Sequence, residues 1–285
     1  MVQTVLPSLK GKIVVRNRDL SDYSRDELSR LIGVVLTDKV DVLDLKVRDL
    51  VAMGRMPYTG FWGHLTEQDH ILVDEAIRLV GICMLRNRPI HSLSDGELQK
   101  VLIAKTLAQE TPFIFLDEPT AFLDYPSKVE LFLLLRRLAR EKQKTVFLST
   151  HDLDLVLQMA DRLWLLSQEQ GLLTGIPEDL VDFFSHPHLL FSPEHMNFQV
   201  KTDVPGNGVK VKIEGVEGVA RTLLCRALSR YGIMTGDSSA AISVFVQNTA
   251  DMPCYTLMKK TDILLKTDSI EELLQSISVS ISVPE

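Results

Sequence analysis

Short apolar runs alternate with amphipathic stretches along the first two thirds of the chain. The apolar runs predict strands at residues 12–15, 31–36, 113–116, 145–149 and 162–166. The run at 31–36 contains no charged or hydroxyl side chain, which is typical of a strand buried on both faces. Helices are expected at 25–30, across much of 45–110 with breaks at 57–63 and at Pro89, and at 128–141.

Two of these helices carry further local signals. Ser24 and Glu27 are spaced as a capping box at the start of the helix at 25–30. In the helix at 128–141 the apolar face is expected at Val129, Phe132, Leu133 and residues 136–138. Strands that alternate with helices predict a parallel sheet with right-handed crossovers, and therefore an α/β fold.

The pattern of apolar and polar residues changes after about Met196. Residues 199–285 predict strands at 209–213, 242–246 and 255–258 and helices at 216–231 and 269–277, which together make a small α+β module. Two interpretations of this module remain open: a regulatory module that senses a ligand or dimerises, and a stabilising extension.

Composition excludes several classes of protein. A net charge of −7 argues against a nucleic-acid partner, because a phosphate backbone selects basic surfaces. Cys83, Cys225 and Cys254 are scattered and fit a reduced compartment. No apolar run approaches the roughly 18 residues of a membrane span, and the first residues lack the pattern of a secretory signal. A cytoplasmic protein is the expectation.

Two acids follow the predicted strand at 113–116. At the carboxyl end of a parallel strand, Asp117 can hold Mg²⁺ directly or through water. Glu118 is then placed to orient and deprotonate an attacking water. The same pair also fits an acidic turn of no catalytic importance, and the two acids alone leave both interpretations open.

The segment Leu93-Ser94-Asp95-Gly96-Glu97 precedes a predicted helix. Ser94 and Glu97 have the capping-box spacing, and the free amides and positive dipole end of such a helix suit a phosphate. Gly96 would let the phosphate approach the backbone. The capping pattern by itself is equally typical of an ordinary helix start.

His151 directly follows the strand at 145–149 and precedes Asp152. An imidazole there could hydrogen-bond a γ-phosphate and respond to its loss. A solvated or capping histidine is the alternative.

The order of these segments resembles the ATP-binding-cassette (ABC) ATPases. LSDGE at 93–97 is followed by LDEPT at 116–120, AFLD at 121–124 and STHD at 149–152. The resemblance covers roughly residues 8–180. It implies ATP and Mg²⁺ as cofactors and a head-to-tail pair of cassettes, in which the signature of one closes on the γ-phosphate held by the other.

The resemblance also implies a role for each motif. Asp117 matches the Mg²⁺-binding Walker B acid, Glu118 the catalytic glutamate and His151 the switch histidine. The nucleotide-contacting set is Ser94, Asp95, Gly96 and Glu97 of the signature motif, Asp124 of the D-loop, and Thr37, which stands where the family usually has glutamine. Since threonine is shorter, the coupling role of position 37 is in question.

A narrower similarity lies in the helical subdomain expected at about 43–110. Met-Gly-Arg-Met-Pro-Tyr at 53–58, Asp69, the helix at 72–81 and Arg88-Pro89 are similar to cassettes of importers for iron-siderophores, haem and cobalamin. Tyr58, Phe61 and Trp62 would then help to receive a coupling helix of the membrane subunit; the alternative is that they are core of the subdomain.

The resemblance therefore implies several partners and a location. The partners are membrane permease subunits, a second ATP-binding subunit (a homodimer or an intact paralogue) and, indirectly, a periplasmic or surface binding protein. The location is the inner face of the cell membrane.

A phosphate-binding loop of the form G-x-x-x-x-G-K-[S/T] does not occur in the 285 residues. The early pair Gly11-Lys12 is followed by Ile13, and Leu6 stands five positions before Gly11. By resemblance, Met1 falls within the helix that follows the loop. We expect an N-terminally truncated ABC domain at 1–198, without its first strands and Walker A motif, and an accessory α+β module at 199–285.

Three hypotheses follow. The leading one is an importer ATPase subunit whose true start lies upstream of Met1, catalytically impaired as written. The second is a degenerate, non-hydrolysing cassette that lends its signature motif to an intact subunit. The third is an ABC protein of DNA repair or translation control, which usually carries a long coiled coil or tandem cassettes, and neither occurs here.

Overall fold

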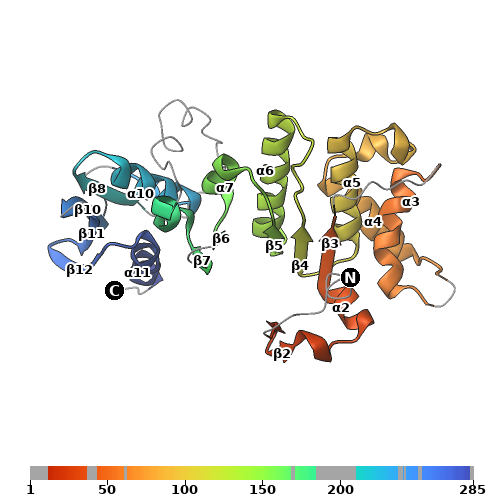
Figure 1. Cartoon of the computed structure of the whole chain (residues 1–285), viewed down its shortest axis with the longest axis horizontal. Helices are drawn as coiled ribbons and strands as arrows, with labels where there is room; N and C mark the ends of the chain where they lie inside the picture. The colour runs from red at the N-terminus through yellow and green to blue at the C-terminus, as the bar shows by residue number, and fades with distance from the viewer. Residues whose placement is uncertain are drawn as a thin grey trace. The chain divides into compact units, whose positions relative to one another are not determined.

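The chain folds into two compact units, residues 1–152 and 153–285, each with its own hydrophobic core (Figure 1). The computed structural model describes residues 12–36, 44–60, 63–167, 171–183, 210–236, 240, 242–249 and 252–282. The domain boundary expected at 198/199 lies outside the described residues and stays a prediction.

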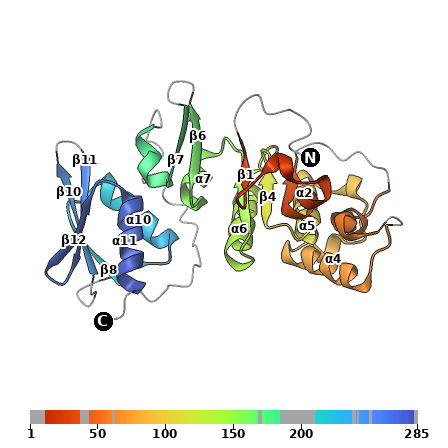
Figure 2. The same ribbon diagram turned by 90° about the horizontal axis from the view of Figure 1, so that it is seen from below.

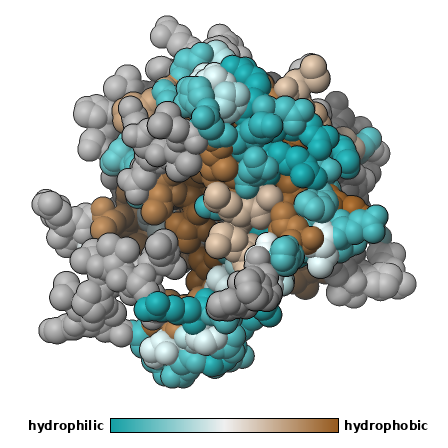
Figure 3. Space-filling model, turned by 90° about the vertical axis from the view of Figure 1, so that its right-hand side faces the viewer, coloured by the Kyte–Doolittle hydropathy of each residue, from teal (hydrophilic) through white to brown (hydrophobic). Residues whose placement is uncertain are grey.

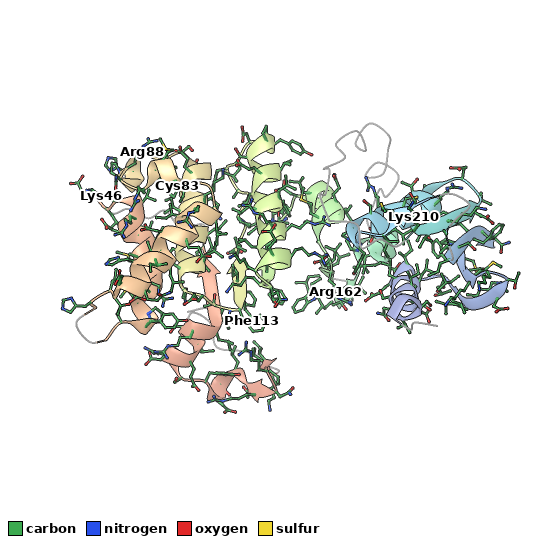
Figure 4. All side chains as sticks on the ribbon, turned by 180° about the vertical axis from the view of Figure 1, so that it is seen from behind. Lys46, Cys83, Arg88, Phe113, Arg162 and Lys210 are labelled. Carbon is green, nitrogen blue, oxygen red and sulfur yellow. The ribbon has the colours of Figure 1, made fainter. Side chains whose placement is uncertain are left out.

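The first unit is built on a parallel sheet of three strands in the order β3-β4-β5. These are β3 (Ile32–Val35), β4 (Phe113–Leu116, whose first residue is labelled in Figure 4) and β5 (Thr145–Leu148). The three strands are in register and end together, with Val35, Leu116 and Leu148 side by side. The predicted α/β class is confirmed. In β3, however, buried and half-buried residues alternate, so the expected burial on both faces is incomplete.

Helices surround this sheet where the sequence predicts them. A short hairpin of β1 (Val14–Val15) and β2 (Arg18–Asp19) precedes them. The helical elements of the first unit are η1 (Leu20–Asp22), α2 (Arg25–Leu31), α3 (Val47–Ala52), η2 (Met53–Tyr58), α4 (Glu67–Leu79), η3 (Cys83–Leu85), η4 (Ile90–Ser92), α5 (Asp95–Ala108) and α6 (Tyr125–Glu141). The predicted capping box of Ser24 and Glu27 is present in α2.

The predicted face of α6 needs correction. The helix begins three residues before the expected start because Asp124 caps it. Its buried residues are Leu131, Phe132, Leu134, Leu135 and Leu138, whereas Leu133 is 38% exposed. Phe132 and Leu138 lie on the buried face as expected, whereas the other buried residues are leucines that the predicted face did not include.

Two glycines let backbone segments approach closely in this unit. A Cβ on Gly54 would lie 2.1 Å from the carbonyl oxygen of Lys105 in α5. A Cβ on Gly33 would lie 2.3 Å from a side-chain carbon of Thr106. Only glycine fits at these two positions, and η2 and β3 therefore pack directly on α5.

Arg55 holds the helical subdomain together. Its guanidinium donates to Asp69 Oδ1, to Glu110 Oε2 and to the carbonyl oxygen of Ala108, each at 2.8 Å. It also lies over the ring of Tyr58, 4.1 Å from the centroid. Arg55 and Asp69 are 5% exposed each, so this ion pair is buried. A buried charge is tolerated only when it is fully paired, and three acceptors meet that condition.

Backbone contacts also join two segments of the same subdomain. Val47 donates its amide to the carbonyl of Arg88 at 3.0 Å, and an isolated antiparallel bridge pairs Lys46 with Pro89. Lys46 and Arg88 accordingly lie close together in Figure 4. The segment before α3 and the segment before α5 are thereby joined.

The second unit contains α7 (Leu153–Met159), then a hairpin of β6 (Leu163–Ser167) and β7 (Gly171–Gly175), then η5 (Pro177–Phe183). The strand expected at 162–166 is present, but it pairs antiparallel with β7 in a separate two-stranded sheet. The expectation that it is a fourth strand of the parallel sheet is not met. The sequence interpretation missed β7, whose first and last residues are both glycine.

The predicted α+β module is confirmed as a five-stranded sheet in the order β12-β11-β10-β8-β9. Figure 2 shows α10 and α11 lying against this sheet, and both contribute buried leucines to one core. The elements are β8 (Lys210–Gly215), α10 (Val219–Arg230), β9 (Met234–Thr235), β10 (Ile242–Thr249), β11 (Met252–Lys259), β12 (Asp262–Thr267) and α11 (Ile270–Ser282). The sequence interpretation missed β9 and β12.

Polar contacts attach η5 to this module. Glu178 and Arg230 form an ion pair in which each side chain is 3% exposed. Burial raises the pKa of Glu178, although the neighbouring Arg230 opposes this effect. Asp179 accepts hydrogen bonds from the amides of Ile270 at 2.9 Å and Glu271 at 3.1 Å, and thereby caps α11. Residues 177–183 thus belong structurally with the last third of the chain.

Replacing Arg55 with methionine should destabilise the chain by about 3–5 kcal/mol, because the substitution leaves the buried Asp69 carboxylate without its cation. The measurement is the free energy of unfolding in urea. Arg86→Met is the matched control, since the Arg86–Asp74 pair at 3.2 Å is exposed and should contribute less than about 1 kcal/mol. Equal losses in both variants would contradict the assignment.

The same network predicts a dependence of stability on pH. Hydrogen bonds from Thr66 and Arg55 hold the pKa of Asp69 at about 2. An unfolded aspartate titrates near 4, so the contribution of Asp69 is complete above that pH and is lost as the pH falls towards 2. Urea unfolding between pH 6 and pH 3 should show a steeper loss in wild type than in Asp69→Asn.

Candidate functional site

The carboxyl ends of β4 and β5 meet at one edge of the parallel sheet. The ladder continues one residue past the strands, since Asp117 donates its amide to Val35 and Ser149 donates its amide to Leu116, both at 3.0 Å. The register of the strands therefore places the residues after β4 directly beside the residues after β5.

Four side chains and one backbone amide form a connected group at this edge. Ser149 Oγ donates to Asp117 Oδ1 at 2.7 Å and accepts from the amide of Glu118 at 2.9 Å. His151 Nε2 lies 2.9 Å from Glu118 Oε1. The structure thus brings Asp117, Glu118 and His151 together, as the sequence hypothesis requires.

The group is open to solvent. Asp117 and Ser149 are exposed, and the side chain of His151 is 95% exposed while that of Glu118 is 32% exposed. An accessible carboxylate at the end of a strand suits Mg²⁺, which keeps several of its waters in protein sites. Asp117 fits that ion, with Glu118 beside it as the candidate base.

A second connected group ties the loops that follow the two strands. Asp152 accepts from the hydroxyl of Thr120 and from Lys128 Nζ, the latter at 2.7 Å. Partial burial opposes ionisation of Asp152, but the hydrogen bonds from Lys128 and Thr120 outweigh it and lower its pKa. The loop with the acids, the loop with His151 and helix α6 are therefore joined.

The signature segment starts α5 with a complete capping box. Ser94 Oγ accepts from the Glu97 amide at 3.3 Å, and Glu97 Oε2 accepts from the Ser94 amide at 2.9 Å. The bond from the Ser94 amide lowers the pKa of Glu97. Ser94 and Asp95 are both exposed, so the amides of this first turn are accessible to a ligand.

Asp124 lies next to the same helix start. It caps α6 by accepting from the Ser127 amide at 3.1 Å, and hydrogen bonds from the side chain and the amide of Ser127 lower the pKa of Asp124. A cavity of about 120 Å³ between α5 and α6 is lined by Ser94, Gly96, Leu123 and Ser127 among others. A Cβ on Gly96 would be 3.6 Å from Leu123, so the first turn of α5 faces the residues before α6.

The predicted site residues thus fall into two groups. One contains Asp117, Glu118 and His151; the other contains Ser94–Glu97 and Asp124, and no hydrogen bond or ion pair among the described residues joins the two. Thr37, Phe61 and Trp62 lie outside the described residues. The sequence interpretation missed Ser149, although a small polar residue directly after a strand that neighbours the acids is a usable signal.

The motif at 53–58 forms a partly apolar surface. Met53 is 40% exposed, Met56 67% and Tyr58 36%. Figure 3 looks at the first unit from the side of α3 and shows apolar side chains gathered on that face. The orientation of Tyr58 is restrained, because its hydroxyl donates a hydrogen bond to the carbonyl of Gln109 at 2.9 Å.

Comparison with known proteins adds to this geometry. The family model described as ABC transporter matches residues 1–121, and the model described as Iron ABC transporter C-terminal domain matches residues 208–278. The petrobactin import ATP-binding protein FpuD of Bacillus anthracis is 31% identical over 199 residues, which are 70% of this chain and 71% of that protein. The chain belongs to the ABC transporter ATP-binding proteins.

Two further relatives are also transport ATP-binding proteins. An uncharacterized ABC transporter ATP-binding protein of Methanocaldococcus jannaschii is 38% identical over 63% of this chain, and the achromobactin transport ATP-binding protein CbrD of Dickeya dadantii is 35% identical over 62%. The chain spans 62% and 66% of these two relatives, a little under two thirds of each.

A solved structure shows the same fold. Clostridium perfringens cbiO1, part of the ABC transporter complex cbiONQ, superposes with a TM-score of 0.56 at 29% identity, covering 70% of this chain and 76% of that one. In the described part of this ABC chain, no helix is both long and apolar enough to cross a membrane.

Replacing Ser94 with alanine should destabilise the chain by about 1 kcal/mol, because the amide of Glu97 loses its acceptor. Ser94→Asp should retain most of the stability, since aspartate is an equally good cap. Thermal unfolding measures both. Ser24→Ala is the matched control, because it removes a capping box of the same type from α2. If Ser94→Ala unfolds with wild-type stability, the cap at Ser94 is not formed.

Proposed function

We propose that this chain is the ATP-binding subunit that energises an ABC importer. The observation that carries the proposal is the group Asp117–Ser149–Glu118–His151, in which two carboxylates and an imidazole lie together at one accessible edge of the sheet. In this proposal Asp117 binds Mg²⁺, Glu118 activates the attacking water and His151 contacts the γ-phosphate. When bound there, Mg²⁺ would neutralise part of the negative charge of the phosphates.

The second group of residues serves the opposite cassette of a pair. Ser94, Asp95, Gly96 and Glu97 present the accessible first turn of α5, where free amides and the helix dipole suit a phosphate. Among the described residues no hydrogen bond or ion pair joins this turn to the acids of the same chain, which agrees with a nucleotide held between two cassettes. Asp124 and position 37 complete the proposed nucleotide-binding set.

The cargo proposed is an iron chelate, haem or cobalamin. Support comes from relatives whose names state petrobactin import and achromobactin transport, and from the match of residues 208–278 to an iron ABC transporter module. A cobalamin import ATP-binding protein of Halobacterium salinarum is also 34% identical over 60% of this chain. The match at 208–278 supports the proposed accessory module at 199–285, beside a cassette at 1–198.

The partners follow from the same proposal. Membrane permease subunits dock on the cassette, and the exposed Met53, Met56 and Tyr58 support a place for them on the helical subdomain. A second ATP-binding subunit completes the nucleotide sites, and a binding protein delivers cargo on the far side. The chain then works at the inner face of the membrane.

The 285 residues by themselves are proposed to turn over little ATP. They contain no glycine-rich phosphate loop, and each charge-assisted phosphate contact is worth about 1.5–3 kcal/mol. The second candidate function is a cassette that does not hydrolyse ATP but lends its signature motif to an intact subunit. The accessible capping box at Ser94 supports that role, since it does not depend on the phosphate loop.

A gain of function tests the proposal. A chimera that carries the phosphate-loop segment of a related cassette ahead of Met1 should hydrolyse ATP, whereas the 285 residues alone should not bind it at micromolar concentration. Glu118→Gln in the chimera should lower kcat by at least about 100-fold, as expected for loss of a general base.

The control for the chimera is Glu141→Gln, which makes the same chemical change at an exposed residue at the end of α6. Phosphate release measures turnover, and circular dichroism verifies folding. A folded chimera whose activity survives Glu118→Gln would rule out the assigned base. A folded chimera without any turnover would favour the second candidate function.

A further inference from the structure

The hydroxyl of Ser149 occupies a central position in the acid group. It is the only atom in the described contacts that bonds to both Asp117 and Glu118, as a donor to Asp117 Oδ1 at 2.7 Å and as an acceptor from the Glu118 amide at 2.9 Å. A hydroxyl has one proton and two lone pairs, so these two bonds use the proton and one lone pair. The direction of both bonds is thereby fixed.

The backbone of Glu118 explains why such a bond matters. Glu118 has a φ of 43°, in the left-handed region that side chains other than glycine rarely adopt. A strained residue keeps such a conformation only when its surroundings hold it there. The bond from the Glu118 amide to Ser149 is a direct restraint on this turn, and the turn aims the carboxylate at His151.

The bond to Asp117 has a separate consequence. Because the Ser149 proton is committed to Oδ1, the carboxylate is held in one orientation and Oδ2 is left for a cation or its water. One side chain directly after β5 therefore orients the metal-binding acid and the base acid together.

We propose that Ser149 is a positioning residue that holds both acids of the ATP site in their working geometry. Without its hydroxyl the Glu118 turn relaxes and the contact between Glu118 and His151 loosens, while the strands beneath remain paired. This inference rests on the proposed function, since that function gives the two acids their roles.

The test observes the His151 imidazole in the full chain without nucleotide. In ¹⁵N-labelled protein, the His151 ring signals are identified by their loss in His151→Gln, and Glu118→Ala, which removes the acceptor, gives their position when the contact is broken. Ser149→Ala should move the His151 signals most of the way to that position, which corresponds to a fall of about threefold to tenfold in the paired population. Ser149→Thr, which keeps the hydroxyl, should restore the wild-type position.

Ser29→Ala is the matched control, because it removes a hydroxyl of α2 that donates to the Asp26 carbonyl at 2.8 Å. It should leave the His151 signals unchanged. His151 signals that stay in place in Ser149→Ala, or that move equally in Ser149→Thr, overturn the inference. Signals that do not respond to Glu118→Ala overturn it as well, because the contact would then not exist.

The measurement separates this inference from the function on which it rests. No ATP takes part, so failure of the proposed function appears as an inactive folded chimera, whereas failure of the Ser149 assignment appears in the imidazole spectrum alone.

Discussion

The site depends on one constraint, the common register of β3, β4 and β5. Because the three strands end together, the residues after β4 and β5 are forced into contact although about 30 residues separate them in sequence. A shift of one residue would turn every side chain of a strand to the opposite face and separate Glu118 from His151. The backbone bonds of Asp117 and Ser149 beyond the strand ends lock this register at the point where it matters.

The secondary-structure prediction was most accurate where particular residues mark the ends of an element. β4 was placed correctly because its apolar run lies between Pro112 and Asp117, and α5 was recognised from the capping pattern of Ser94 and Glu97. β7 and β12 were not predicted, because each strand is defined by its pairing partner and not by its own composition. The wrong partner expected for β6 has the same cause, since pairing is a tertiary property.

The functional residues show the same division. The acids, the signature serine and the histidine were identifiable because motif order is carried by the sequence itself. The role of Ser149 was not, because it arises only when β5 lies next to β4 and the hydroxyl reaches two neighbours at once. Arg55 and Asp69 were likewise visible as residues but not as a buried pair, since a separation of 14 positions in sequence gives no indication of contact.

The attachment of η5 changes how the last third of the chain should be regarded. Glu178 reaches Arg230 inside the core, and Asp179 supplies the acceptors for the first amides of α11. Deleting the residues from 199 onward would therefore not trim a removable appendage. It would remove Arg230 and most of the core that covers Glu178, and it would expose the apolar side chains of Leu157 and Ile176 that pack in that core.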